Sequence, residues 1–195
     1  KSKIILINFT GKMGRAIAEN CMLRGAHVTL VNASVSVEPP MFVDVVNVTS
    51  AADMADVVKS KAAEQDIIIM TAAVADFCPS HPADEKIKKN DSSYESVIEL
   101  ERTEDILSYL GAHKTKGQLI CGFSMETQNM LENSKAKLAK KNADMIVANN
   151  LKVAGAGFGT DTNVVTLITA DDCTELEIMD KSCVAARIMD RLLQM

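Results

Sequence analysis

The 195-residue sequence has no apolar run that approaches the ~18–20 residues with which a helix crosses a bilayer. Its start also lacks the pattern of a signal peptide, because residues 1–3 lead only into the short apolar run at residues 4–7. We therefore expect a soluble, cytoplasmic protein without a membrane partner. The length indicates a single domain that occupies residues 1–195.

Basic residues are not in excess either. The formal net charge is −5 at pH 7 and the isoelectric point is about 5.3. Non-specific binding to nucleic acid needs a basic face, so the composition argues against a nucleic-acid partner. A single anionic ligand can still bind in a local basic pocket.

The five cysteines include no C-x-x-C pair, and their number is odd. This pattern argues against structural zinc and against a disulfide framework. We expect most of them to be reduced, buried and apolar, with Cys78 in a polar loop as the exposed one. The sequence shows neither a Ser–His–Asp pattern nor a metal-ligand spacing.

What the sequence does contain is a regular alternation of short apolar runs and amphipathic segments. Strands are predicted at residues 4–7, 28–31, 42–48, 66–71, 97–100, 119–123 and 144–148. Helices are predicted at residues 12–24, 51–64, 103–113 and 126–141. This alternation is typical of an α/β fold with a doubly wound, mostly parallel, Rossmann-like sheet.

The end of the chain changes character. Two β-prone runs at residues 164–169 and 175–179 predict a C-terminal β-hairpin, and residues 181–193 predict a terminal helix. In a doubly wound sheet, ligands bind at the carboxyl ends of the strands, where the strand order reverses. The loops after Ile7, Thr71, Phe123 and Ala148 are therefore where we expect a site.

Two of these loops are rich in small residues. Gly11 lies in the turn TGKMG at residues 10–14, which opens the first helix and could present N–H groups to phosphate or simply pack the helix on the sheet. After the strand at 66–71, Ala72 and Ala73 would let a ligand lie against the backbone. Asp76 could then accept hydrogen bonds from a sugar or a base, or could cap a helix or turn.

Lysines form the second group of candidates. Lys86 lies in the run EKIKK within a long polar segment at residues 75–96, where it could close over a triphosphate or form part of a solvated face. Lys137 and Lys141 are four residues apart and therefore share one helix face. They could bind an anion between them, or they could both be solvated.

Taken in order, these motifs resemble phosphopantothenate–cysteine ligase of the bacterial, CTP-dependent kind, over nearly the whole chain. The segments that carry the resemblance are GKMG at 11–14, RGAHVTLV at 24–31, AAVADF at 72–77, EKIKK at 85–89, TEDIL at 103–107, GF at 122–123, ET at 126–127, ANN at 148–150, Asp161 with Asn163, and Lys181 with Val184 and Ala185.

The resemblance implies that the carboxylate of 4′-phosphopantothenate attacks CTP to give an acyl-cytidylate, and that L-cysteine then forms the amide. It implies catalytic roles for Asn8 and Lys86, and substrate contacts for Asn8 and Ala72. It implies a nucleotide site made of Gly11, Ala73, Asp76, Lys86, Glu104, Asp105, Ile106, Leu107, Phe123, Lys137 and Lys141. It also implies Mg²⁺ with the triphosphate, a homodimer, and a decarboxylase domain or partner.

The sequence departs from the family after the first strand. The family has a Gly-Gly-Thr-type loop there, followed by a segment with an arginine, whereas here Ile7 runs directly into Asn8. If this loop is truly deleted, activation of the acid would be impaired. If it is not, Asn8 need not be the family's asparagine, which polarises the acyl-cytidylate. A second difference is the pair Ser124-Met125, where the family has small residues.

Two other classes of protein share this architecture. An NAD(P)-dependent oxidoreductase would be expected to carry G-x-G-x-x-G or a Tyr with Lys four residues on, and the sequence has neither: Tyr94 is followed by Ile98 and Tyr109 by His113. A non-catalytic nucleotide-binding module is the other alternative, and the sequence does not distinguish it from the ligase.

Overall fold

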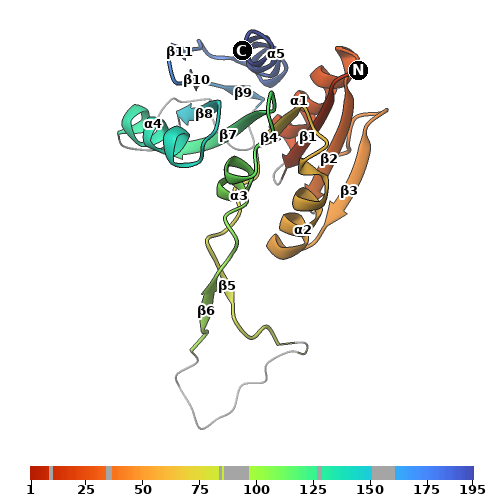
Figure 1. The fold of residues 1–195 in the computed structure, drawn as a ribbon, viewed down its shortest axis with the longest axis vertical. Helices are drawn as coiled ribbons and strands as arrows, with labels where there is room; N and C mark the ends of the chain where they lie inside the picture. Colours follow the sequence, from red (N-terminus) through yellow and green to blue (C-terminus); the bar gives the residue numbers. More distant parts are fainter. Residues whose placement is uncertain (9–10, 34–36, 84, 86–96, 127–128, 151–160) are drawn as a thin grey trace.

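A computed structural model describes the chain except residues 9–10, 34–36, 84, 86–96, 127–128 and 151–160 (Figure 1). Within the described residues, an eight-stranded sheet has the order β11-β10-β8-β7-β4-β1-β2-β3. Its strands are β1 Lys3–Asn8, β2 His27–Ala33, β3 Asp44–Val48, β4 Ile67–Met70, β7 Leu119–Glu126, β8 Met145–Asn150, β10 Val165–Ile168 and β11 Cys173–Glu175. The helices are α1 Lys12–Leu23, α2 Ala51–Ala62, α3 Ile106–Ala112, α4 Met130–Lys140 and α5 Lys181–Leu192.

Six neighbouring strands of this sheet are parallel, and they confirm the predicted doubly wound arrangement. They are β8, β7, β4, β1, β2 and β3. β1 lies between β2 and β4, with Ile4 opposite both Val28 and Ile67. The chain runs outward from β1 to β3 and then crosses back to β4 on the other side of β1. The strand order therefore reverses between β1 and β4, which is where such a sheet opens a crevice.

The apolar runs of the strands are buried on both faces of the sheet, as is typical of parallel strands. In β1, Ile4 and Leu6 pack into a cluster with α1 and α5, whereas Ile5 and Ile7 pack into a second cluster with α2 and α3. All four side chains are at most 3% exposed. Successive residues of a strand point to opposite faces, so one unbroken run of isoleucine and leucine supplies both layers of the core.

The predicted strand at residues 97–100 was placed wrongly. The strand is β6, Leu100–Arg102, and it pairs antiparallel with β5, Phe77–Pro79, outside the main sheet. Figure 1 shows this pair extending away from the body of the molecule as an arm. We call the described residues 77–83 and 97–102 the arm.

The predicted C-terminal hairpin is confirmed, with an earlier second strand. β10 pairs antiparallel with β8 and with β11, which begins at Cys173. The turn is tight because the Thr169 N–H donates to the Asp172 carbonyl at 2.9 Å. A further short pair joins β9, Thr162–Asn163, to β12, Met179–Asp180, directly before α5. None of the described helices is long and apolar enough to cross a membrane.

The cysteine prediction holds for only part of the set. Cys21 and Cys121 are buried, and burial raises the pKa of the Cys21 thiol to about 12. Cys173 and Cys183 are exposed, although they were expected to be buried, and Cys78 is half-buried. The reason is local: Cys173 starts the edge strand β11, and Cys183 lies on the outer face of α5.

Candidate active site

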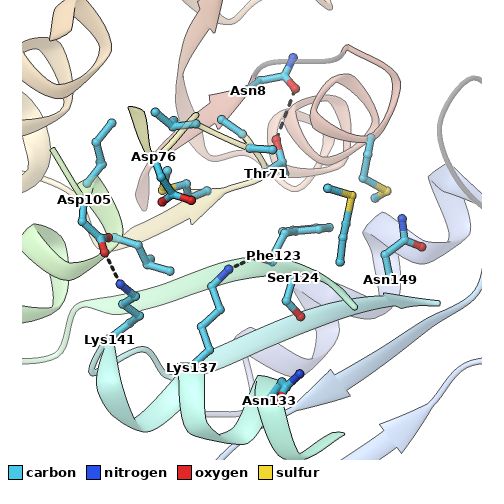
Figure 2. Close-up of a pocket in the computed structure, with 18 of the residues that line it drawn as sticks. Asn8, Thr71, Asp76, Asp105, Phe123, Ser124, Asn133, Lys137, Lys141 and Asn149 are labelled. Carbon is cyan, nitrogen blue, oxygen red and sulfur yellow. Dashed lines mark hydrogen bonds and ion pairs between the residues drawn. The ribbon is translucent and has the colours of Figure 1, made fainter. Parts of the chain in front are cut away.

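A cavity of about 970 Å³ opens at the carboxyl ends of β1, β4, β7 and β8 (Figure 2). Its walls also come from the beginnings of α1, α3 and α5 and from one face of α4. The site residues predicted from the sequence that line it are Asn8, Ala72, Ala73, Asp76, Glu104, Asp105, Ile106, Leu107, Phe123, Lys137 and Lys141. Lys86 lies outside the described residues, and Gly11 does not line the cavity.

Asn8 is the last residue of β1 and is only 3% exposed. Its side-chain oxygen accepts hydrogen bonds from the Thr71 hydroxyl at 3.3 Å and from the Gly11 N–H at 3.4 Å, and its amide donates to Asn32 at 3.4 Å. A β-carbon on Gly14 would lie 2.3 Å from the same oxygen, so only glycine fits there. The glycine turn therefore packs around Asn8, with Gly11 at a φ of 95°.

The segment after β4 forms the second wall. Ala72, Ala73 and Asp76 follow the strand without regular structure, and the Asp76 carbonyl accepts a hydrogen bond from the Thr103 N–H at 3.0 Å. This contact joins the wall to the beginning of α3. The Asp76 carboxylate is exposed and lies among the lining side chains in Figure 2, where a hydroxyl or amine of a ligand could reach it.

The beginning of α3 brings two carboxylates to the cavity. Asp105 caps the helix by accepting the Ser108 N–H at 3.0 Å, which explains why α3 begins later than predicted. Partial burial raises the pKa of Asp105, but hydrogen bonds from Lys141 and Ser108 outweigh that effect and hold it below its usual value. Glu104 accepts a hydrogen bond from Lys59 at 2.6 Å.

Two lysines of α4 face the cavity from the opposite wall, as their spacing of four residues predicts. The Lys137 ammonium donates to the Phe123 carbonyl at 2.8 Å. The Lys141 ammonium pairs with the Asp105 carboxylate and donates to the Ser108 hydroxyl at 2.9 Å. Figure 2 shows both lysines rising from α4 toward α3 and β7. Their positive charges suit the phosphates of a nucleotide.

A further group of polar residues, which the prediction did not include in the site, lines the other end of the cavity. It consists of Lys12, Asn149, Asn163 and Lys181. Lys181 is only 8% exposed, and burial, followed by the charge of Lys12, lowers the pKa of its ammonium. The spacing of the terminal helix could have predicted this burial. Lys181 occupies position i of an i, i+3, i+4, i+7 stripe whose other members, Val184, Ala185 and Ile188, are apolar and buried.

Among the residues that the structure describes, no group of three or more histidine, cysteine, aspartate or glutamate side chains gathers where it could hold a metal ion.

The fold and the cavity together define a class of protein. A Rossmann-like parallel sheet with a lysine-bearing pocket at its switch point is the architecture of α/β proteins that bind nucleotides or other phosphorylated ligands. Within that class, the chain belongs to the family described as DNA/pantothenate metabolism flavoprotein, C-terminal domain, which it matches over residues 4–195.

Individual relatives agree with this family. The chain is 46% identical to the coenzyme A biosynthesis bifunctional protein CoaBC of Bacillus subtilis, over 94% of this chain and 45% of that protein. It is 44% identical to a cysteine/cysteine sulfinic acid decarboxylase of an unknown prokaryote, over 94% of this chain and 51% of that protein. A crystal structure of the C-terminal domain of CoaBC superposes with a TM-score of 0.80 at 37% identity, covering 98% of this chain and 93% of that domain. The chain thus spans about half the length of the curated relatives it matches.

Proposed function

We propose that this chain is a phosphopantothenate–cysteine ligase that uses CTP and acts in coenzyme A biosynthesis. The observation that carries the proposal is the gathering of eleven predicted site residues around one cavity at the switch point of the sheet, in a chain that aligns with the C-terminal domain of CoaBC along nearly its whole length. The residues come from five separate parts of the sequence, so their convergence is a property of the fold.

The reaction has two steps in this proposal. A carboxylate oxygen of 4′-phosphopantothenate attacks the α-phosphorus of CTP. The bond from that phosphorus to the oxygen that bridges to the β-phosphate breaks, and pyrophosphate leaves with its electron pair. The neutral amine of L-cysteine then attacks the acyl carbon, and the bond from that carbon to the cytidylate oxygen breaks so that CMP leaves. The nitrogen loses one proton to water and keeps one as the amide N–H. Both steps depend mainly on positioning and on stabilisation of phosphate charge, which a lysine-lined pocket supplies.

Each wall of the cavity has a role in this scheme. Lys137 and Lys141 would neutralise phosphate oxygens, because both line the cavity from the same side and charged hydrogen bonds to phosphate are strong. Asp76 would accept hydrogen bonds from the sugar or the base. Asn8 would donate its amide to the acyl group, from a position fixed by Thr71 and Gly14.

Lys86 would add a further positive charge from the long segment after β5, and it stays a prediction from the sequence. The choice of CTP over ATP, Mg²⁺ as the accompanying ion, and a cytoplasmic location are likewise part of the proposal. The homodimer is part of the proposal and rests on the resemblance alone. A decarboxylase domain or partner is also part of the proposal, and the bifunctional relatives support it.

The proposal is tested by measuring pyrophosphate release with CTP, Mg²⁺ and 4′-phosphopantothenate, with and without L-cysteine. We expect cysteine-dependent turnover, reduced about tenfold or more in Lys137→Met and in Lys86→Ala, because hydrogen bonds to charged groups contribute about 1.5–3 kcal/mol each. Lys135→Met is the matched control, since Lys135 is an exposed lysine of the same helix that does not line the cavity.

Two other outcomes would replace the proposal. Binding of CTP without pyrophosphate release, at saturating acid and cysteine, would identify a non-catalytic nucleotide-binding module. Quenching of NADH fluorescence together with failure to bind CTP would favour an oxidoreductase of the same architecture.

A further inference from the structure

Two adjacent carboxylates at the beginning of α3 line the cavity, and each has a lysine partner from a different helix. Asp105 pairs with Lys141 of α4, which itself lines the cavity. Glu104 accepts a hydrogen bond from the Lys59 ammonium of α2 at 2.6 Å. Glu104 lines the cavity and Lys59 does not, so Lys59 acts on the cavity through Glu104.

The position of Lys59 is fixed by several contacts between α2 and α3. Its ammonium lies over the ring of Tyr109, 5.5 Å from the ring centre, and this ring stacks on His113 with the two centres 4.1 Å apart. The Asp56 carboxylate lies 3.8 Å from the same ammonium but is largely exposed. Ion-pair and cation–π contacts therefore hold Lys59 against both the beginning and the middle of α3.

Lys59 compensates the charge of Glu104. The hydrogen bond to Glu104 raises the pKa of the Lys59 ammonium; desolvation opposes this effect, and the nearby negative charges add to it. Lys59 is therefore charged at neutral pH. Without it, Glu104 would present an uncompensated negative charge in the wall of the cavity. Charges interact over about 8–10 Å at ordinary ionic strength. Since Glu104 adjoins Asp105, the partner of Lys141, that charge would repel phosphates bound at Lys141.

We propose that Lys59 is a positioning residue for the nucleotide, which holds the Glu104 side chain toward α2 and compensates its charge so that the triphosphate can bind beside Lys141. The inference rests on the proposed function, because it requires that the cavity receive a nucleoside triphosphate. It adds to that function a residue of α2, a helix that supplies no lining residue of the cavity.

The charge of the ligand distinguishes this role from a purely structural one. CTP and CMP share the base, the sugar and the α-phosphate, but CTP carries more negative charge. If Lys59 acts by compensating Glu104, its removal should weaken the binding of CTP more than the binding of CMP. If Lys59 merely keeps α3 in place, its removal should weaken both nucleotides to the same extent.

The experiment measures the Kd of CTP and of CMP by calorimetry on the full chain. Lys59→Met keeps the length of the side chain and removes its charge, whereas Lys59→Arg keeps the charge. Lys61→Met is the matched control, since Lys61 lies two residues along the same helix and does not line the cavity. Glu104→Gln, alone and combined with Lys59→Met, completes a double-mutant cycle. Thermal unfolding checks that each variant is folded.

We expect Lys59→Met to raise the Kd of CTP about three- to fivefold, the upper part of the range for a partly exposed ion pair, and that of CMP much less. Lys59→Arg and Lys61→Met should stay near the wild type. In the Glu104→Gln background, Lys59→Met should no longer weaken CTP relative to CMP by this amount. If Lys59→Met does not fold, Glu104→Gln alone should strengthen CTP relative to CMP, because Lys59 then keeps an uncompensated positive charge.

Two results would overturn the inference and leave the ligase intact. One is an unchanged ratio of the two Kd values in Lys59→Met, and the other is an equal effect of Lys59→Met with and without the Glu104 carboxylate. Failure of the wild type to bind CTP would overturn the proposed function and this inference with it. Binding of CTP without pyrophosphate release would overturn the ligase alone, since the inference concerns the binding of the nucleotide.

Discussion

The sheet and the arm contain similar apolar residues in very different surroundings. In the sheet, residues 67–70 of β4 are all buried, with Ile68 and Ile69 at 0% exposure. In the arm, Phe77 and Leu100 are 49% and 59% exposed, and Val97 and Ile98 are more exposed still. Among the residues that the structure describes, contacts within the chain account for the burial of the apolar residues of the sheet but leave those of the arm exposed.

This difference leads us to expect that another molecule covers the arm. A two-stranded pair standing alone is at best marginally stable in water, and contiguous exposed apolar residues mark interaction surfaces. Since a homodimer is part of the proposal, we expect a second copy of the chain to cover the arm. The edge of the C-terminal hairpin is a poorer candidate for such a contact because β11 exposes Cys173, Thr174 and Glu175, which are not large apolar residues.

The largest expected effect is in the sheet. Ile69→Ala removes a fully buried side chain from the central strand next to β1 and should lower the free energy of unfolding by about 2–5 kcal/mol. Urea unfolding followed by circular dichroism measures this loss. A loss below about 1 kcal/mol would mean that the core is less tightly packed than the burial indicates.

A substitution in the arm should affect dimerisation and leave the stability of the monomer almost unchanged. Leu100→Ser is expected to weaken dimerisation about tenfold, measured by sedimentation over a range of concentrations, while leaving monomer unfolding within about 0.5 kcal/mol. Leu193→Ser is the matched control, since Leu193 is 58% exposed but lies at the end of α5. A wild-type protein that is monomeric at micromolar concentration would contradict the comparison between sheet and arm.

A smaller effect is expected at the start of α2. Ser50 accepts the Asp53 N–H at 3.0 Å, and Asp53 accepts the Ser50 N–H at 3.0 Å, which makes a reciprocal capping box. Ser50→Ala should cost about 1 kcal/mol in urea unfolding without any change in dimerisation. A change in the sedimentation of this variant would show that the body and the arm are not independent.

The smallest expected effect is a loss of stability at low pH. Hydrogen bonds from Thr49 and Ser50 lower the pKa of Asp53, and a hydrogen bond from Lys12 lowers that of Asp161. A folded-state pKa below the unfolded value gives stability that is present above about pH 4 and is lost as the pH falls through the folded pKa. The urea midpoint should therefore be lower at pH 3.5 than at pH 6. A midpoint that rises on acidification would contradict these pairings.

The strands of the sheet could be predicted from the sequence because each is determined by a short run of neighbouring residues. An unbroken apolar run such as residues 67–70 specifies a strand covered on both faces, and the alternation with amphipathic segments specifies parallel neighbours. The three-residue strands of the arm carry no such pattern. Their partners are about 23 residues apart, as in the pairing of Cys78 with Glu101, and neither strand has a buried face.

The site residues also fall into those that the sequence predicted and those that it did not. Helical spacing predicted that Lys137 and Lys141 share one helix face, and the position of Asp76 after a strand end made it a candidate. The resemblance to the family then assigned all three to the nucleotide site. Lys12, Asn149 and Lys181 were missed as a group because they meet only when α1, β8 and α5 converge. The sequence marked the loop after Ala148 as a place for a site, but no spacing in the sequence relates Asn149 to Lys12 and Lys181, so the fold was needed to bring the three into one cavity.

An acyl-cytidylate leaves a record in the CMP that the enzyme releases. We would supply 4′-phosphopantothenate with ¹⁸O in its carboxylate, together with CTP, Mg²⁺ and L-cysteine, and determine the mass of the CMP by mass spectrometry. We expect CMP that carries one ¹⁸O, because the attacking carboxylate oxygen stays on phosphorus when the amine displaces the cytidylate. Unlabelled CMP, or turnover without CMP, would show that the cavity does not join the acid to the amine through an acyl-cytidylate.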